Sequence, residues 1–124
     1  MKKLSVILLL SIVISFLSFH DKPVLLQYPS HWEQPHYNFE KNPLSAAKIE
    51  LGRQLFYDPL LSDNNSISCA SCHLSFTAFA HTDHALSHGI HDSIGTRNAP
   101  ALINLAWMKH FMWDGAVNHL DVQA

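Results

Sequence analysis

The feature that most constrains this chain is the pentapeptide Cys-Ala-Ser-Cys-His at residues 69–73, because Cys69 and Cys72 are its only two cysteines. This Cys-x-x-Cys-His pattern is typical of covalent haem attachment. One helical turn presents both thiols to the two vinyl groups of a haem, and His73 can then bind the iron as the proximal ligand. The motif therefore predicts one haem c, linked through Cys69 and Cys72.

The N-terminus predicts that the protein is exported. Lys2 and Lys3 precede an apolar run over residues 4–19 that only serines interrupt, as in a secretory signal. The run is shorter than the roughly 20 residues that span a bilayer comfortably. An uncleaved anchor is the alternative, because no clear cleavage site precedes His20. We expect residues 1–19 to be a signal peptide or N-terminal anchor, and the protein to be periplasmic.

Two other chemistries use such a cysteine pair and stay open at this point. A redox dithiol exchanges disulfides, but it usually belongs to a thioredoxin-like fold of strands and helices. Structural zinc needs four nitrogen or sulfur ligands, for which the ten histidines supply candidates. Haem is the better match to an exported chain with no convincing strand pattern.

The charge balance argues against nucleic acid as a partner. Of eight Lys and Arg residues, Lys2 and Lys3 belong to the predicted signal, which leaves six against ten Asp and Glu in residues 20–124. Nucleic acids and anionic membranes attract basic surfaces. A mildly acidic domain of this size more often needs a cofactor, a metal or a disulfide to stabilise its small core.

Local patterns predict a mainly helical domain over residues 43–124, preceded by an extended leader over residues 20–42 that lies against it. Ser45 can cap a helix that Asp58-Pro59 ends, since the residue before proline is pushed out of the helical region. Three further helices are expected. The first crosses the cysteines and starts at Ser66 or Ser68, the second runs from Asn98 to about Lys109 with Pro100 in its first turn, and the third starts at Asn118. Residues 80–95 are expected to form a loop, and residues 113–115 a turn.

Four ordered segments carry a wider resemblance. They read Leu-Gly-Arg-Gln-Leu-Phe-Tyr-Asp at 51–58 with Leu-Ser at 61–62, Ser-Ile-Ser-Cys-Ala-Ser-Cys-His at 66–73, Gly-Thr-Arg-Asn-Ala-Pro at 95–100 and Trp-Asp-Gly at 113–115. In this order they resemble the N-terminal half of the bacterial di-haem cytochrome c peroxidases, and are similar to the relative that matures methylamine dehydrogenase. The resemblance covers about residues 43–124 and implies an all-α, cytochrome c-like haem domain.

The resemblance implies an enzyme that reduces hydrogen peroxide to water with electrons from a cytochrome c or a cupredoxin. In the family, peroxide reacts at the N-terminal haem, a second haem in a C-terminal domain accepts the electrons, and calcium lies between the domains. By position, His73 is the proximal iron ligand, Trp113 matches the tryptophan between the haems, and Asn98 matches an asparagine of the calcium site.

A distal iron ligand is implied in the loop ahead of Arg97, where the family often keeps a histidine. His91 lies closest to that position and ranks first, and His88 ranks second. Met108 and Met112 can also ligate iron, although their helical spacing places them in the expected core. Arg97 itself is expected to pair with a haem propionate or with a carboxylate, between which the sequence does not choose.

The chain also departs from the family pattern. It reaches Ala124 with one Cys-x-x-Cys-His motif and an alanine at position 116, where the family usually has arginine. Its histidine-rich loop aligns imperfectly. We therefore expect a fragment, a truncated copy or half of a split system, with weak activity of its own. The alternatives are a mono-haem electron-transfer protein without catalysis and an inactive haem-bearing remnant.

Three aromatic side chains are expected to line the haem pocket: Phe56, Phe76 and Phe79.

Overall fold

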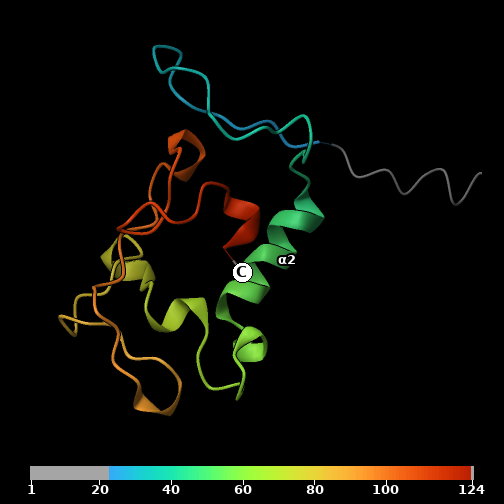
Figure 1. The fold of residues 1–124 in the computed structure, drawn as a ribbon. Coiled ribbons are helices and arrows are strands. Elements are labelled where there is room, and N and C mark those ends of the chain that lie inside the picture. Colours follow the sequence, from blue (N-terminus) through green and yellow to red (C-terminus); the bar gives the residue numbers. More distant parts are fainter. Residues whose placement is uncertain (1–22, 124) are drawn as a thin grey trace, which may run out of the picture.

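The structure, a computed structural model, describes residues 23–123 (Figure 1). Within this range helices are the only regular elements, and four isolated β-bridges join loop segments without forming a strand. The one longer helix is α2 (Ala46–Tyr57), and the rest are three-residue 3₁₀ turns. These turns are η1 (Pro59–Leu61), η2 (Cys69–Ser71), η3 (Ser75–Thr77), η4 (Ile90–Asp92), η5 (Leu105–Trp107) and η6 (Leu120–Val122).

The all-α expectation is correct only in that the regular elements of residues 23–123 are helices, because most of this range lies in turns and loops. The predicted signal or anchor, residues 1–19, lies outside the described residues. From residue 23 to residue 123, no helix combines the length and the apolar content that a membrane crossing requires.

Helix α2 begins and ends where the sequence predicts. The Ser45 side chain accepts a hydrogen bond from the Lys48 N–H at 3.3 Å, which is N-capping. At the other end the Asp58 N–H donates to the Gln54 carbonyl, and the Asp58 side chain accepts from the Leu60 N–H at 2.9 Å. Asp58 thus closes α2 and caps η1, so the chain reverses direction ahead of the cysteines.

The predicted helix from Asn98 to Lys109 is wrong. Only η5 is helical there, and Asn104 has a left-handed backbone (φ 53°) that interrupts any longer helix. The main-chain carbonyls of Asn98 and Ala99 accept hydrogen bonds from distant residues instead of residues one turn ahead. Long-range contacts therefore outweigh the local helical preference of this segment.

The two methionines of this part of the chain are exposed. Met108 is 44% exposed and Met112 is 54% exposed, so the expectation that helical spacing places both in the core is also wrong. The turn at residues 113–115 is confirmed, with Gly115 at φ 70° and its N–H donating to the Met112 carbonyl.

The described part of the leader, residues 23–42, contacts the domain at η5. The edges of Tyr28 and Trp32 meet the Trp107 ring with centroids 5.2 and 5.1 Å apart. The Trp107 indole N–H donates to the Glu33 carbonyl at 2.8 Å. Aromatic edge contacts of this kind add to the stabilisation that buried area provides, so Trp107 is the main anchor of the leader.

Tyr37 makes a second anchor at the end of the leader. Its N–H donates to the Ala106 carbonyl, and its hydroxyl donates to Asp121 Oδ1 at 2.7 Å. Burial, followed by the Asp121 carboxylate, raises the pKa of Tyr37 above its ordinary value. These contacts join the leader to η6, at the far end of the sequence.

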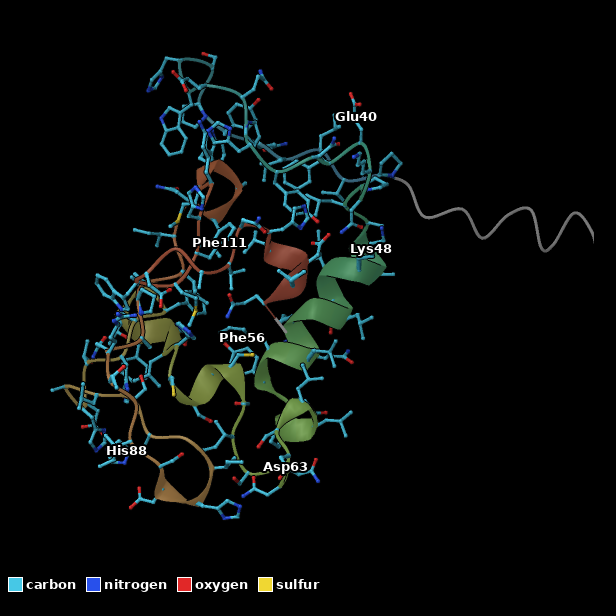
Figure 2. The ribbon with its side chains drawn as sticks, viewed as in Figure 1. Glu40, Lys48, Phe56, Asp63, His88 and Phe111 are labelled. Carbon is cyan, nitrogen blue, oxygen red and sulfur yellow. The ribbon has the colours of Figure 1, made fainter. Side chains whose placement is uncertain are left out.

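The apolar side chains of the described residues are poorly buried. Ala99 and Phe111 alone fall in the buried class, each 8% exposed, and α2 contributes no buried residue. Figure 2 shows Phe56 projecting from α2 towards the cysteine segment and Phe111 on the C-terminal loops. Interiors of stable domains are normally close-packed. This part of the chain therefore does not close a hydrophobic core with its own side chains.

The leader contacts predict that Trp107→Phe releases the leader. The phenyl ring keeps aromatic packing but loses the N–H that bonds Glu33, so we expect the free energy of unfolding to fall by about 1 kcal/mol. Limited proteolysis should cut residues 23–42 faster than in the unmodified chain. Trp32→Phe, a matched change that leaves this hydrogen bond in place, should have a smaller effect. Equal losses in both variants would contradict the prediction.

Candidate functional site

The cysteine segment forms a single tight turn. Ser68 begins η2, where its N–H donates to Ser71 Oγ at 3.1 Å, and the N–H groups of Cys72 and His73 both donate to the Cys69 carbonyl. The short helix expected across the cysteines is thus confirmed, with Ser68 at its start. Both thiols are free; Cys69 is exposed and Cys72 is half-buried.

His73, directly after the turn, has a fixed ring orientation. Its Nδ1–H donates to the Phe79 carbonyl oxygen at 2.8 Å, which leaves Nε2 as the nitrogen available to a metal. Proteins hold iron- and zinc-binding histidines by such a bond, because it fixes the ring and raises the basicity of the ligating nitrogen. His73 is therefore oriented as a ligand rather than as a solvated side chain.

The backbone after His73 makes this bond possible. Ala78 (φ 55°) and Phe79 (φ 58°) both adopt the left-handed conformation, which costs residues other than glycine roughly 1–2 kcal/mol each. The chain consequently turns back, the Phe79 N–H donates to the Leu74 carbonyl at 2.9 Å, and Leu74 and Ala80 form a β-bridge. Strained backbone of this kind gathers at functional sites.

This donor set fits a c-type haem. Two free thiols on one turn are followed by an imidazole whose Nε2 is available. A cavity of about 350 Å³ beside Cys69 is lined by Leu61, Ile67 and Ile90 and by polar residues such as Asp58, but Cys72 and His73 are not part of its lining. Between residues 23 and 123, no group of three or more His, Cys, Asp or Glu side chains is placed to hold a metal ion. The zinc alternative therefore has no ligand set in this range.

The three phenylalanines expected at the haem behave differently. Phe56 and Phe79 meet edge to face with centroids 5.7 Å apart, so α2 contacts the loop that orients His73. Phe76 is 82% exposed and takes no part in that contact. The structure thus brings together two of the three residues.

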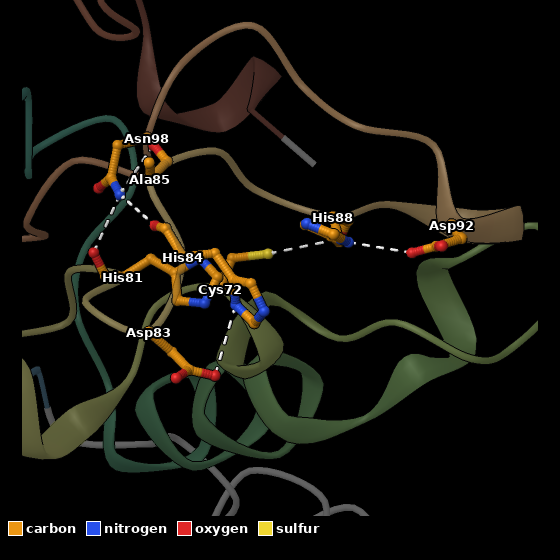
Figure 3. Close-up of polar contacts among 8 residues, drawn as sticks. All are labelled: Cys72, His81, Asp83, His84, Ala85, His88, Asp92 and Asn98. Carbon is orange, nitrogen blue, oxygen red and sulfur yellow. Dashed lines mark hydrogen bonds and ion pairs between the residues drawn. The ribbon is translucent and has the colours of Figure 1, made fainter.

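The histidine loop, residues 81–88, lies beside the second thiol (Figure 3). The rings of His81 and His84 have centroids 5.4 Å apart, those of His84 and His88 4.8 Å. The Cys72 thiol approaches the His88 carbonyl at 3.9 Å, and His88 Nδ1 lies 2.9 Å from Asp92 Oδ1. Three imidazoles therefore lie in a row with their rings tilted to one another, and the main chain of His88 lies next to the cysteine turn.

His91, the first candidate for the distal ligand, is not in this row. It is exposed and sits in η4 with a left-handed backbone (φ 54°). His88, the second candidate, has its Nδ1 on Asp92 and its main chain beside Cys72. The assignment of a distal ligand to either residue stays a prediction, although the structure places the backbone of His88 beside Cys72.

Among the described residues, Arg97 pairs with a carboxylate. Its guanidinium donates to the Asp114 carboxylate at 3.0 Å, with both side chains about half exposed. The Asp114 carboxylate also accepts from the Ala116 N–H at 3.1 Å. That backbone bond, followed by the Arg97 bond, lowers the pKa of Asp114 below its ordinary value. Arg97 therefore braces the turn at residues 113–115.

Trp113 and Asn98 are joined to each other. The Trp113 ring is 63% exposed, and its indole N–H donates to the Asn98 carbonyl at 2.7 Å. The Asn98 side-chain nitrogen donates to the carbonyls of His81 and His84, both at 3.0 Å. Calcium takes six to eight oxygen ligands, and one amide oxygen from Asn98 supplies a single one. The calcium role of Asn98 stays a prediction.

Sequence reasoning missed two functional contacts. The Phe79 carbonyl carries no sequence signal, because a left-handed backbone at Ala78 and Phe79 is not expected without glycine. The Asn98 side-chain bonds were missed because an asparagine before Ala-Pro reads equally well as a helix cap.

Comparison with known proteins places these features in a family. The family model for di-haem cytochrome c peroxidase matches residues 46–124. The chain is 38% identical over 89 residues to the methylamine utilization protein MauG of Methylorubrum extorquens, covering 67% of this chain and 23% of that protein. It is 40% identical over 83 residues to the cytochrome-c peroxidase IdrP1 of Pseudomonas sp. strain SCT, covering 67% and 22%.

A solved structure agrees with these matches. The crystal structure of a MauG-like protein associated with microbial copper homeostasis superposes with a TM-score of 0.64 at 35% identity, over 72% of this chain and 25% of that one. The present chain thus spans about a quarter of the length of the proteins it matches.

The geometry around Cys69 and Cys72 predicts covalent haem at one site. Protein expressed with haem-attachment machinery should keep a pyridine haemochrome spectrum after denaturation and acid–acetone extraction. Cys69→Ala combined with Cys72→Ala should abolish attachment and lower stability, since a ligand that binds only the native state stabilises it. Ser71→Ala, within the same turn, should retain haem. Haem that washes out of the unmodified chain would show that the assignment is wrong.

Proposed function

The chain belongs to the di-haem cytochrome c peroxidase family, and from this premise we propose that it forms the peroxide-reacting haem domain of such an enzyme. The proposed activity is the reduction of hydrogen peroxide to water with electrons from a small redox protein. The observation that carries it is the cysteine turn with His73, whose Nδ1 is bonded to the Phe79 carbonyl and whose Nε2 is available.

The relatives support a peroxidase-type oxidoreductase more strongly than any one substrate. The IdrP1 proteins, the cytochrome c peroxidase Ccp of Escherichia coli and the cytochrome c551 peroxidase of Pseudomonas aeruginosa carry peroxidase in their names, whereas MauG is named for methylamine utilization. Because the chain spans about a quarter of these proteins, hydrogen peroxide as substrate and a cytochrome c or cupredoxin as donor are part of the proposal.

Cys69, Cys72 and His73 would hold the haem, two through thioether bonds and one through its Nε2. When bound, the haem supplies the iron at which the oxygen–oxygen bond of peroxide is cleaved. His73 keeps its proton on Nδ1, shared with the Phe79 carbonyl, and so presents an electron-rich nitrogen. Phe56 packs edge to face against the Phe79 ring, and the bond itself is partly buried.

The reaction needs protons as well as electrons, since one H₂O₂, two electrons and two protons give two molecules of water. Imidazoles are the side chains best suited to move protons near neutral pH. We propose that a histidine from residues 81–91 serves on the distal side, with His91 kept as the first candidate and His88 as the second. The contact of His88 Nδ1 with Asp92 Oδ1 at 2.9 Å orients the ring and leaves Nε2 outside that contact.

The proposed enzyme also needs a second haem domain and calcium. A second haem domain would deliver electrons past Trp113, whose ring is exposed, and calcium would take the Asn98 side-chain oxygen together with ligands from that domain. Export through residues 1–19 to the periplasm fits covalent haem attachment, which takes place outside the cytoplasm.

The identity of the distal ligand can be tested by spin state. If His91 is the sixth ligand, the oxidised protein should be low-spin, and His91→Ala should shift its visible spectrum and electron paramagnetic resonance towards high-spin. His119→Ala, a remote histidine change, should leave both unchanged. If the spectrum is unchanged in His91→Ala but changes in His88→Ala or Met112→Ala, the distal ligand is the residue whose replacement changes it.

Electron counting predicts that the 124-residue chain alone turns over peroxide slowly. One iron(III) haem must obtain both electrons from outside, whereas a second haem in the same protein stores one of them. With reduced cytochrome c as donor, we expect turnover at least about tenfold below that of a protein extended through a second haem domain, a difference in barrier of about 1.4 kcal/mol. Both should be measured at equal haem concentration.

Two outcomes would contradict the proposal that this domain needs a second haem to reduce peroxide. Equal rates would mean that one haem suffices and would remove the support for Trp113 as an inter-haem residue. Rapid electron exchange without peroxide turnover in either protein would favour the mono-haem electron carrier.

A further inference from the structure

Asn98 makes an unusual set of contacts for one side chain (Figure 3). Its amide nitrogen donates to the main-chain carbonyls of His81 and His84, both at 3.0 Å, and lies 3.4 Å from that of Ala85. These acceptors are 13 to 17 residues away in sequence. A primary amide has two N–H donors, and here both point into the histidine loop.

The same residue accepts a bond on its other side. Its main-chain carbonyl receives the Trp113 indole N–H at 2.7 Å, and its neighbour Arg97 bonds Asp114 at 3.0 Å. Asn98 therefore stands between the histidine loop and the turn at residues 113–115. A displacement of Trp113 would therefore also displace the main chain of Asn98, which carries the side-chain amide.

Main-chain bonds also hold the loop near its ends, and the shortest joins the Gly95 N–H to the Ser87 carbonyl at 2.8 Å. The His81 N–H donates to the Ala99 carbonyl at 3.4 Å and the Ser87 N–H to the Arg97 carbonyl at 3.5 Å, both longer than a typical N–H···O bond of about 2.9–3.0 Å. The two Asn98 bonds are shorter than either. They are thus the better-formed of the links between residues 97–99 and the loop.

We propose that Asn98 is a positioning residue, a clasp that fixes the histidine loop beside Cys72 and couples its position to that of Trp113. This role uses the amide nitrogen, and it differs from calcium binding, which uses the amide oxygen. Its consequence for the iron rests on the proposed function, because the loop reaches a distal position only if haem is attached at Cys69 and Cys72. The clasp itself rests on the contacts alone.

Asn98→Asp separates the two roles, because aspartate keeps the oxygen and loses both donors. Hydrogen–deuterium exchange on the haem-loaded chain should be at least about fivefold faster in residues 81–88, the change that corresponds to loss of one net hydrogen bond. Exchange in α2 and the haem content should stay as in the unmodified protein. Asn118→Asp makes the same change of charge at an exposed asparagine and should have no such effect. Asn98→Ala removes the donors without adding charge and replaces Asn98→Asp if that variant does not fold.

Coupling to Trp113 is measured by a double-mutant cycle. Trp113→Phe keeps an aromatic ring but cannot donate to the Asn98 carbonyl, so it should also speed exchange in residues 81–88. In the double variant the effect should be less than the sum of the two, since both act through one clasp. Additive effects would overturn the coupling.

The clasp is overturned if Asn98→Asp exchanges as the unmodified protein does, with calcium or with a chelator, because the oxygen alone would then suffice. Uniformly faster exchange throughout the chain would also overturn it in favour of a general structural role. The haem spectrum of the same samples reports separately on the proposed function. Faster loop exchange with an unchanged spin state would support the clasp and count against a distal ligand in this loop.

Discussion

The hydrogen bond from His73 Nδ1–H to the Phe79 carbonyl governs the rest of the site. It selects Nε2 as the ligating nitrogen, and it exists only because Ala78 and Phe79 take left-handed conformations at a cost in backbone energy. The reversal that follows brings Phe79 against Phe56 of α2. One bond to a main-chain oxygen thus links the cysteine turn, a strained loop and helix α2.

The segment at residues 97–99 serves as a second organising element. It bonds the turn at residues 113–115 through Arg97 and the Asn98 carbonyl, and it bonds the histidine loop through the Asn98 side chain. Sequence motifs that are far apart along the chain therefore form one polar network beside the cysteine turn. This arrangement explains why the segment is not helical, since its carbonyls and its asparagine are used for long-range bonds.

The sequence predicted those features that depend on residues close together along the chain. Ser45, Asp58-Pro59 and Ser68 determine turns and helix ends within a few residues, and these predictions are confirmed. The helix expected from Asn98 to Lys109 failed because its cap, proline and apolar spacing are local signals, whereas the bonds of Asn98 to His81 and Trp113 are not. The ring contacts among His81, His84 and His88 likewise depend on a loop path that no periodicity indicates.

The scarcity of buried apolar side chains has a consequence for biogenesis. With Ala99 and Phe111 as the only buried apolar residues described, the polypeptide gains little free energy from collapse before a large apolar ligand is enclosed. Under the proposed function, haem attachment would then precede compaction. If it is exported as proposed, the chain would depend on partners that keep Cys69 and Cys72 reduced until haem attachment, because a disulfide between them would leave no thiol to react with the haem.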